Sequence, residues 1–371
     1  MKEIKELAEI WDIENKKNNL LAIGSERRIY SELCDSIEIL KDFKFEPYQP
    51  IPNPPKPDFI KRMKEWLNQF EKEDQKYLFY LVSKLIFFTH PQINHLMDYL
   101  FQNKIKKIIL EDIILENNLP PFSYKEAEES LLSELEKTLF VGLSDSSRIN
   151  DFTHINMDYI NRTINTGIEL ETLIYPSKRR IVYNLQGNSQ KVEFCSDFEK
   201  SVLLEDDLLL NKTRLIILED FSGSGSDIIK QFSYLNSSSL PFKKIIFAPY
   251  IITYKACEIL DNWIDNNQDD RNYHYTYGTK IPEDVKCFDY NKSYLSSEWP
   301  DKNVDICDKI KQTCNSIYEK YFPPDSSYCY GIGEIIIAFA TYYNCPDNSL
   351  PILWCDEGGW KPLLQRASRI M

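Results

Sequence analysis

The chain has 371 residues, 43% of them hydrophobic and 27% charged, so it is long enough for two domains and can bury a large core. A formal net charge of −13 argues against direct binding of nucleic acid over the whole surface. Nine cysteines without a Cys-x-x-Cys pair, an amino terminus without a signal-peptide pattern and the lack of a membrane-length apolar run lead us to expect a cytoplasmic protein with reduced thiols and no membrane contact.

Residues 1–135 show helical patterns almost throughout. Helices are predicted at about 2–11, 25–43, 59–70, 71–89 and, as one or two segments, 91–117. A proline-rich strap at 45–58 interrupts them, because a segment with so many prolines forms neither a helix nor a central strand. We therefore expect an α-helical amino-terminal region that contains this strap.

From residue 136 onward, apolar strands alternate with helices. Strands are predicted at 138–143, 181–183, 214–218, 244–252 and 273–277, and helices at 153–166, 226–235, 253–266 and 303–321. Such alternation implies right-handed crossovers, so we expect an α/β domain over 136–371 with a parallel sheet flanked by helices. Its last part, 330–371, begins with a predicted strand at 334–342 and forms a carboxyl-terminal cap, either a rigid strap or a lid in which Trp354 stacks on a base.

The residues after the strand at 214–218 suggest a binding site. Glu219 and Asp220 end the strand, and a helix starts a few residues later. The five residues before that helix are small: Ser222, Gly223, Ser224, Gly225 and Ser226. Ligands bind at the carboxyl ends of strands in open α/β sheets, so we expect both acids at a solvent-accessible edge.

This loop has the chemistry of a pocket for a phosphorylated sugar. Glycines let backbone N–H groups approach a phosphate, and a helix amino terminus favours an anion. Two carboxylates can accept hydrogen bonds from two ribose hydroxyls, directly or through Mg²⁺. The glycine spacing fits neither a Walker A loop nor a dinucleotide-binding fingerprint. The alternative is a simple Ser/Gly turn between a strand and a helix.

Residues 215–226 resemble the binding motif for 5-phosphoribosyl 1-pyrophosphate (PRPP) of type I phosphoribosyltransferases, with Ser224-Gly225 in place of its Thr-Gly. Asp227 stands where that motif has a threonine, which puts one hydroxyl contact to the 5-phosphate in doubt. The segments 144–148, 346–354 and 359–363 are further similar, in the same order, to the PRTase-CE family of conflict-exapted phosphoribosyltransferases from bacterial antiphage defence loci. The resemblance implies a type I phosphoribosyltransferase-like fold.

The resemblance also implies roles for residues outside the motif. The loop of Asp145, Ser146 and Ser147 would lie under the pyrophosphate, with Arg148 as its cation; the alternative is a polar helix cap with a surface arginine. Lys178 and Arg179 would belong to a basic loop that closes over PRPP, or to a solvated turn. Glu219 and Asp220 would hold Mg²⁺ indirectly, through the ligand.

Two functions follow, and the first is favoured. One is an antiphage effector, in a retron-like system, that binds PRPP with Mg²⁺ or a related ribose phosphate and transfers the ribosyl group, with Glu219, Asp220 and Arg148 as its catalytic residues. The other is a catalytically inactive fold that senses a nucleotide or bridges proteins. A reverse transcriptase or an ATPase of the same defence system is the expected partner. A nucleic-acid adaptor is a weaker third hypothesis, because the chain is acidic.

Overall fold

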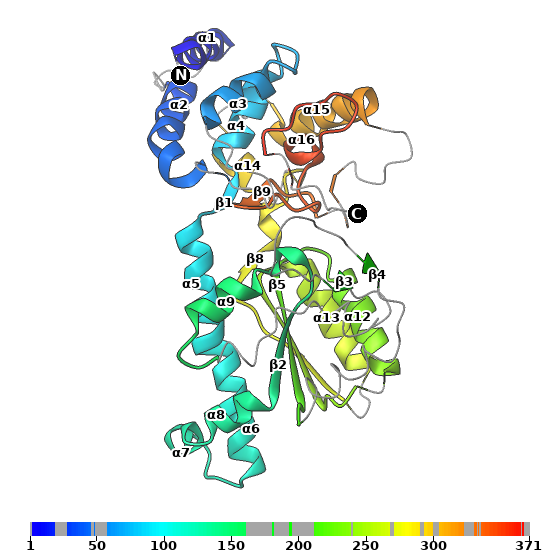
Figure 1. Cartoon of the computed structure of the whole chain (residues 1–371). Helices are drawn as coiled ribbons and strands as arrows, with labels where there is room; N and C mark the ends of the chain where they lie inside the picture. Colours follow the sequence, from blue (N-terminus) through cyan, green and yellow to red (C-terminus); the bar gives the residue numbers. More distant parts are fainter. Residues whose placement is uncertain are drawn as a thin grey trace. The chain divides into compact units, whose positions relative to one another are not determined.

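The computed structural model describes residues 2–18, 28–45, 48, 58–160, 180–181, 193–194, 211–238, 240–267, 271–289, 293–299, 304–322, 330–331, 333, 335–364 and 366 (Figure 1). Most of the proline-rich strap, together with Lys178 and Arg179, lies outside these residues. The chain divides into two compact units, Met1–Ile93 with Ile281–Met371, and Asn94–Lys280. The boundaries of these units, between residues 93 and 94 and between 280 and 281, lie away from the change from helix to strand expected near residue 135.

The unit Asn94–Lys280 contains a parallel sheet and the helices around it. Its strands are β2 (Thr138–Gly142), β3 (Arg180–Ile181), β4 (Glu193–Phe194), β5 (Arg214–Ser222), β6 (Lys244–Thr253), β7 (Asn272–Tyr275) and, at its end, β8 (Thr279–Ile281). Its helices are α5 (His90–Leu100), which begins in the other unit, η2 (Phe101–Ile105), α6 (Lys106–Glu116), α7 (Tyr124–Glu128), α8 (Leu131–Glu136), η3 (Asp145–Ser147), α9 (Ile149–Ile155), α12 (Ser226–Ser237) and α13 (Tyr254–Asn266).

The sheet has the strand order β2-β5-β6-β7, with β8 also paired to β6. All pairs along this order are parallel, which confirms the expected sheet type. Strand β5 is buried along its whole length and runs to Ser222, four residues beyond the predicted end at Leu218, because Phe221 and Ser222 continue the ladder with β6. The predicted strand at 181–183 overlaps β3 at Ile181, and β3 pairs antiparallel with β4; Val182 and Tyr183 lie outside the described residues.

Helices cover both faces of this sheet (Figure 1). Helices α12 and α13 pack on one face, where Phe232 and Leu260 join a buried cluster with Leu215 and Phe247 of the strands. Helix α9 lies against the other face, with Phe152 near the strand residue Phe140. Helix α9 begins earlier than the predicted helix at 153–166 and ends at Ile155; residues 156–160 form turns, and 161–166 lie outside the described part.

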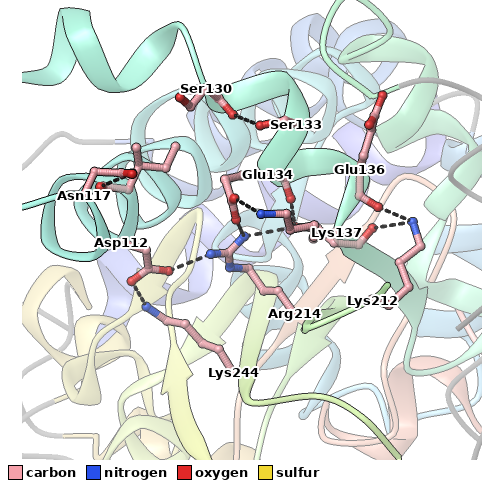
Figure 2. Close-up of polar contacts among 12 residues, drawn as sticks. Asp112, Asn117, Ser130, Ser133, Glu134, Glu136, Lys137, Lys212, Arg214 and Lys244 are labelled. Carbon is pink, nitrogen blue, oxygen red and sulfur yellow. Dashed lines mark hydrogen bonds and ion pairs between the residues drawn. The ribbon is translucent and has the colours of Figure 1, made fainter. Parts of the chain in front are cut away.

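An ion-pair network fixes α6 and α8 to the amino ends of the central strands (Figure 2). Asp112 of α6 pairs with Arg214 at the start of β5, with 3.0 Å between Oδ2 and Nη2, and with Lys244 at the start of β6. Arg214 also lies near Glu134 of α8 and donates to the hydroxyl of Thr138 at 3.2 Å. Buried charges need such partners, and breaking one pair would leave the other charge uncompensated.

The other unit is built from helices and one small sheet. Its elements are α1 (Lys2–Asn18), α2 (Ile29–Leu40), η1 (Lys41–Phe45), α3 (Phe59–Leu67), α4 (Gln75–Ser83), β1 (Ile86–Phe88), η5 (Glu283–Val285), α14 (Tyr294–Glu298), α15 (Ile306–Tyr321), β9 (Phe339–Thr341) and α16 (Pro351–Trp354). Strands β1 and β9 form a parallel pair.

Two predictions for this unit were wrong. The helix predicted at 71–89 ends at Ser83, and Ile86–Phe88 is the strand β1, because these β-branched and aromatic residues pair with Phe339–Thr341. The strand predicted at 334–342 is limited to β9; just before it, Ile336 has a φ of 59° and Ile337 makes only an isolated bridge to Ser349. A left-handed residue cannot continue a strand. None of the helices that the structure describes combines the length and apolar character of a bilayer crossing.

Candidate functional site

The carboxyl ends of β2, β5 and β6 meet at one edge of the sheet, as the parallel register requires. Gly142 pairs with Leu218, and Leu218 pairs with Ala248. The backbone N–H of Leu143 then donates to the carbonyl of Leu218 at 2.8 Å, which brings the loop after β2 over the end of β5. Two loops that are distant in sequence, 143–148 and 222–225, therefore lie at the same edge, the usual place for a ligand.

Glu219 and Asp220 lie within β5 beneath the serine-rich loop that follows β2. Ser144 Oγ donates to Glu219 Oε1 at 2.8 Å, and Ser147 Oγ donates to Glu219 Oε2 at 2.8 Å. Ser146 Oγ donates to Asp220 Oδ1 at 2.9 Å. The structure thus brings Ser146 and Ser147 to the two acids, as carboxylate partners.

The acids are buried, contrary to the solvent-accessible position expected from the sequence. Glu219 is 7% exposed and Asp220 is 2% exposed. The expectation was wrong for two reasons: β5 continues past both residues, and the serines cover their carboxyl oxygens. Removal of Glu219 would therefore leave the buried hydroxyl of Ser147 without its acceptor, and removal of Asp220 would leave the half-buried hydroxyl of Ser146 without its nearer acceptor.

Burial changes the ionisation of the pair. Loss of solvation raises the pKa of Glu219 well above its usual value, and the neighbouring charge of Asp220 and a hydrogen bond between the two carboxyl groups raise it further. Ser147 and Ser144 act in the opposite direction by donating to the carboxylate. Burial and the neighbouring Asp220 thus outweigh the two serines, and the net direction of the pKa of Glu219 is upward.

The small-residue loop leads directly into α12. Gly225 has a φ of 71° and precedes the helix, and a Cβ built on it would lie 3.3 Å from the carbonyl oxygen of Ala256. The hydroxyl of Thr253, at the end of β6, donates to the carbonyl of Gly223 and so fixes the loop from the neighbouring strand. Ser224 and Ser226 have hydroxyl oxygens 2.6 Å apart, and Ser226 is exposed. The first N–H groups of α12 therefore lie beside an exposed pair of hydroxyls, and this arrangement is suited to binding an anion.

Arg148 is tied to its own helix. It has a left-handed backbone, with a φ of 47°, where η3 passes into α9. Its guanidinium forms an ion pair and a hydrogen bond with Asp151 one turn further on. Ser144 and Ser147 form a capping box around η3, which supports the alternative of a polar helix cap. A role of Arg148 toward pyrophosphate stays a prediction. The backbone of Asp145 lies in η3 beside the acid pair.

Sequence reasoning missed Tyr250 and Thr253, both on β6. Tyr250 is buried, and its hydroxyl donates to the carbonyl of Ser147 at 2.6 Å, so it holds the serine loop against β6. Burial raises the pKa of Tyr250 well above its usual value, and the charges of Asp220 and Glu219 add to the shift. A tyrosine inside an apolar strand is one signal that could have identified it. Thr253 could have been found as the cap of α13, where it accepts from Ala256 N.

Asp227 lies in the first turn of α12, with 77% of its side chain exposed and a 3.4 Å contact to Lys230. A carboxylate at this position interacts favourably with the helix dipole, but it would repel a phosphate bound to the same turn. The departure from threonine at this position therefore changes the charge of the anion site as well as removing a hydroxyl.

The acid pair does not fit a directly held Mg²⁺. Both Glu219 oxygens and Asp220 Oδ1 already accept hydrogen bonds from serines, so a cation bound directly to these oxygens would have to displace the serine hydroxyls. Within the described residues no group of three or more His, Cys, Asp or Glu side chains is placed to hold a metal ion. Mg²⁺ brought in by a pyrophosphate stays a prediction.

Comparison with known proteins adds one finding. Comparison with the curated proteins and with the solved structures gives no match. The family model PRTase-CE matches residues 63–366, which is most of the chain and includes both loops of the candidate site. The parallel sheet, the acid pair on its central strand and this match together show that the chain is a phosphoribosyltransferase-like protein of the PRTase-CE family.

Proposed function

We propose that this protein binds a 5-phosphorylated ribose, such as PRPP, at the edge formed by β2, β5 and β6, and acts as an effector of a bacterial antiphage defence system of the retron type. One observation carries the proposal: strand β5 holds both carboxyl groups, and the glycine-serine loop that follows it leads directly into α12. Phosphate would bind at 222–226, and the carboxyl groups would accept hydrogen bonds from the ribose hydroxyls. The family resemblance supports the defence role.

In the transferase version, the bond between ribose C1 and the pyrophosphate oxygen breaks, and pyrophosphate leaves with the electron pair. A lone pair of the acceptor then forms the new bond to C1, and the proton of the acceptor passes to water. Glu219 and Asp220 would stabilise the positive charge that develops on the sugar, and Arg148 would stabilise the leaving group. Mg²⁺, if carried by PRPP, would neutralise part of the pyrophosphate charge.

A sensor that binds the same ligand without reaction is the second candidate, because two observations favour it. The guanidinium of Arg148 is paired with Asp151, so it is not held ready for an anion. The carboxyl groups of Glu219 and Asp220 are enclosed by serines. In this version a partner protein, such as a reverse transcriptase or an ATPase, would respond to the bound state.

Calorimetry with PRPP and Mg²⁺ tests binding, with Gly225→Val as the variant. We expect at least tenfold weaker binding, because a side chain there is strained at a φ of 71° and lies against Ala256. Gly359→Val is the matched control: Gly359 also has a left-handed φ, 83°, but a Cβ would meet nothing within 4 Å. Wild-type protein that shows no heat with PRPP would refute the proposal.

Arg148→Ala separates the two versions. A transferase should release pyrophosphate from PRPP at least a hundredfold more slowly, a loss of roughly 2.7 kcal/mol, while its affinity for ribose 5-phosphate stays the same. Lys286→Ala is the control, since Lys286 forms an equivalent pair with Glu283 three residues before it. A wild-type protein that binds PRPP but releases no pyrophosphate with any nucleobase tested supports the sensor.

A further inference from the structure

Two serine hydroxyls form a close pair on the two acids. Ser144 Oγ and Ser146 Oγ are 2.8 Å apart. The first lies 2.8 Å from Glu219 Oε1, and the second lies 2.9 Å from Asp220 Oδ1. The two hydroxyls come from one short loop. Ser144 contacts Glu219, and Ser146 contacts Asp220 and, at 3.4 Å, Glu219 Oε1.

Neighbouring hydroxyl oxygens of a furanose lie about equally close to each other, and in a ribose site each of them can donate to a carboxylate. The serine pair therefore presents to Glu219 and Asp220 the groups that a vicinal diol would present. Because the acids are only 7% and 2% exposed, a sugar cannot reach the same oxygens while the serines remain in place.

The third serine of the loop has a different environment. Ser147 is 1% exposed and donates to Glu219 Oε2, and its carbonyl accepts from the buried Tyr250 hydroxyl at 2.6 Å. Ser144 and Ser146 are half-buried, and their contacts to the acids run through side-chain hydroxyls. Ser144 N–H donates to Ser147 Oγ, and Ser147 N–H donates to the carbonyl of Ser144, both at 3.0 Å, so the loop leaves the acids only when these two bonds also break. The contact between the Ser147 carbonyl and Tyr250 then remains as the anchor.

We propose that the loop 144–146 occupies the diol subsite of its own binding site, as an internal competitor that a vicinal-diol ligand must displace. This inference rests on the proposed function, because it assumes that Glu219 and Asp220 accept the hydroxyls of a ribose. The apparent affinity for a ribose phosphate is then reduced by the fraction of molecules in which the loop is closed. A ligand that uses only the phosphate loop does not meet this competitor.

The double variant Ser144→Ala/Ser146→Ala tests the inference by calorimetry with ribose 5-phosphate and with inorganic phosphate. We expect the Kd of ribose 5-phosphate to fall about tenfold, because the closed loop loses its hydrogen bonds to the acids, and the Kd of phosphate to stay the same. If the serines instead contact the ligand, the Kd of ribose 5-phosphate rises. A higher or unchanged Kd with intact phosphate binding overturns the inference and leaves the proposed function standing.

The matched control is Ser133→Ala/Ser237→Ala, since both serines are exposed and each donates to a carbonyl of its own helical segment. If Ser144→Ala/Ser146→Ala does not fold, the inference is tested instead with the single variant Ser146→Ala and with amide hydrogen exchange of the wild type. Ser146→Ala should bind ribose 5-phosphate about threefold more tightly, and the ligand should speed amide exchange at 144–146 in the wild type. Slower exchange overturns the inference, and lack of binding of both ligands overturns the proposed function together with it.

Discussion

Glu219 illustrates how single residues in this protein depend on their surroundings. Its carboxyl group is buried beside Asp220 and contacts the hydroxyls of Ser144 and Ser147. Burial raises its pKa, so the folded chain holds the proton more tightly than the unfolded chain does. Stability from this group is complete at pH below the unfolded value of 4.5 and declines as the pH rises from there toward the folded pKa.

Glu219→Gln should therefore stabilise the protein in a pH-dependent way. Glutamine has nearly the same shape but stays neutral, and the serine hydroxyls can turn to accept from its amide. We expect a free energy of unfolding close to that of the wild type near pH 4 and higher by roughly 1–3 kcal/mol at pH 8. Urea unfolding across this range measures it, with the exposed Glu258→Gln as the control. A variant less stable than the wild type at pH 8 would contradict the raised pKa.

At the scale of elements, the start of α12 decides how well the loop 222–226 can hold an anion. The helix begins after Gly225, and the loop is fixed by Thr253 from the neighbouring strand. Asp227 places a negative charge in the same first turn, paired with the exposed Lys230. The strand, loop and helix were correctly expected from the sequence, because their pattern lies within one short stretch of chain.

Asp227→Thr should raise the affinity for inorganic phosphate and for ribose 5-phosphate by about tenfold, because it removes a repelling charge and supplies a hydroxyl. Asp308→Thr is the control, since Asp308 is also an acid in the first turn of a helix, α15, in the other compact unit. Calorimetry on both variants at equal ionic strength measures the change. Equal affinity in all three proteins would mean that the phosphate does not bind at the start of α12.

At the scale of the whole molecule, the unit Met1–Ile93 with Ile281–Met371 depends on contacts between the two ends of the chain. The indole N–H groups of Trp66 and Trp360 both donate to the carbonyl of Ile352, at 2.7 and 3.0 Å. The Trp360 ring also packs against Phe70 and Tyr321, with ring centroids 5.1 and 5.3 Å apart. The carboxyl-terminal segment therefore forms part of the core of this unit.

Trp360→Ala should lower the free energy of unfolding by roughly 3–5 kcal/mol, because it leaves a large cavity between aromatic rings. Trp354→Ala is the comparison: this tryptophan is half-buried, and its ring is covered on one side by Arg366. Urea unfolding followed by circular dichroism should show the larger loss for Trp360→Ala. A loss below that of Trp354→Ala would show that Trp360 is not part of the core.

The sequence alone determined the order of strands and helices between 214 and 266, the glycine-serine loop and the family, because these depend on residues that are near one another in the chain. It also placed Glu219 and Asp220 near the carboxyl end of β5. Only the tertiary structure decided that these acids are buried, because the serines that cover them are distant in the chain. Ser144 and Ser147, which donate to Glu219, precede it by 75 and 72 residues. The same reason applies to β1, which exists as a strand only through its pairing with β9. Burial, the largest cause of the raised pKa of Glu219, depends on contacts from distant segments, and the periodicity within one segment gives no information about those contacts.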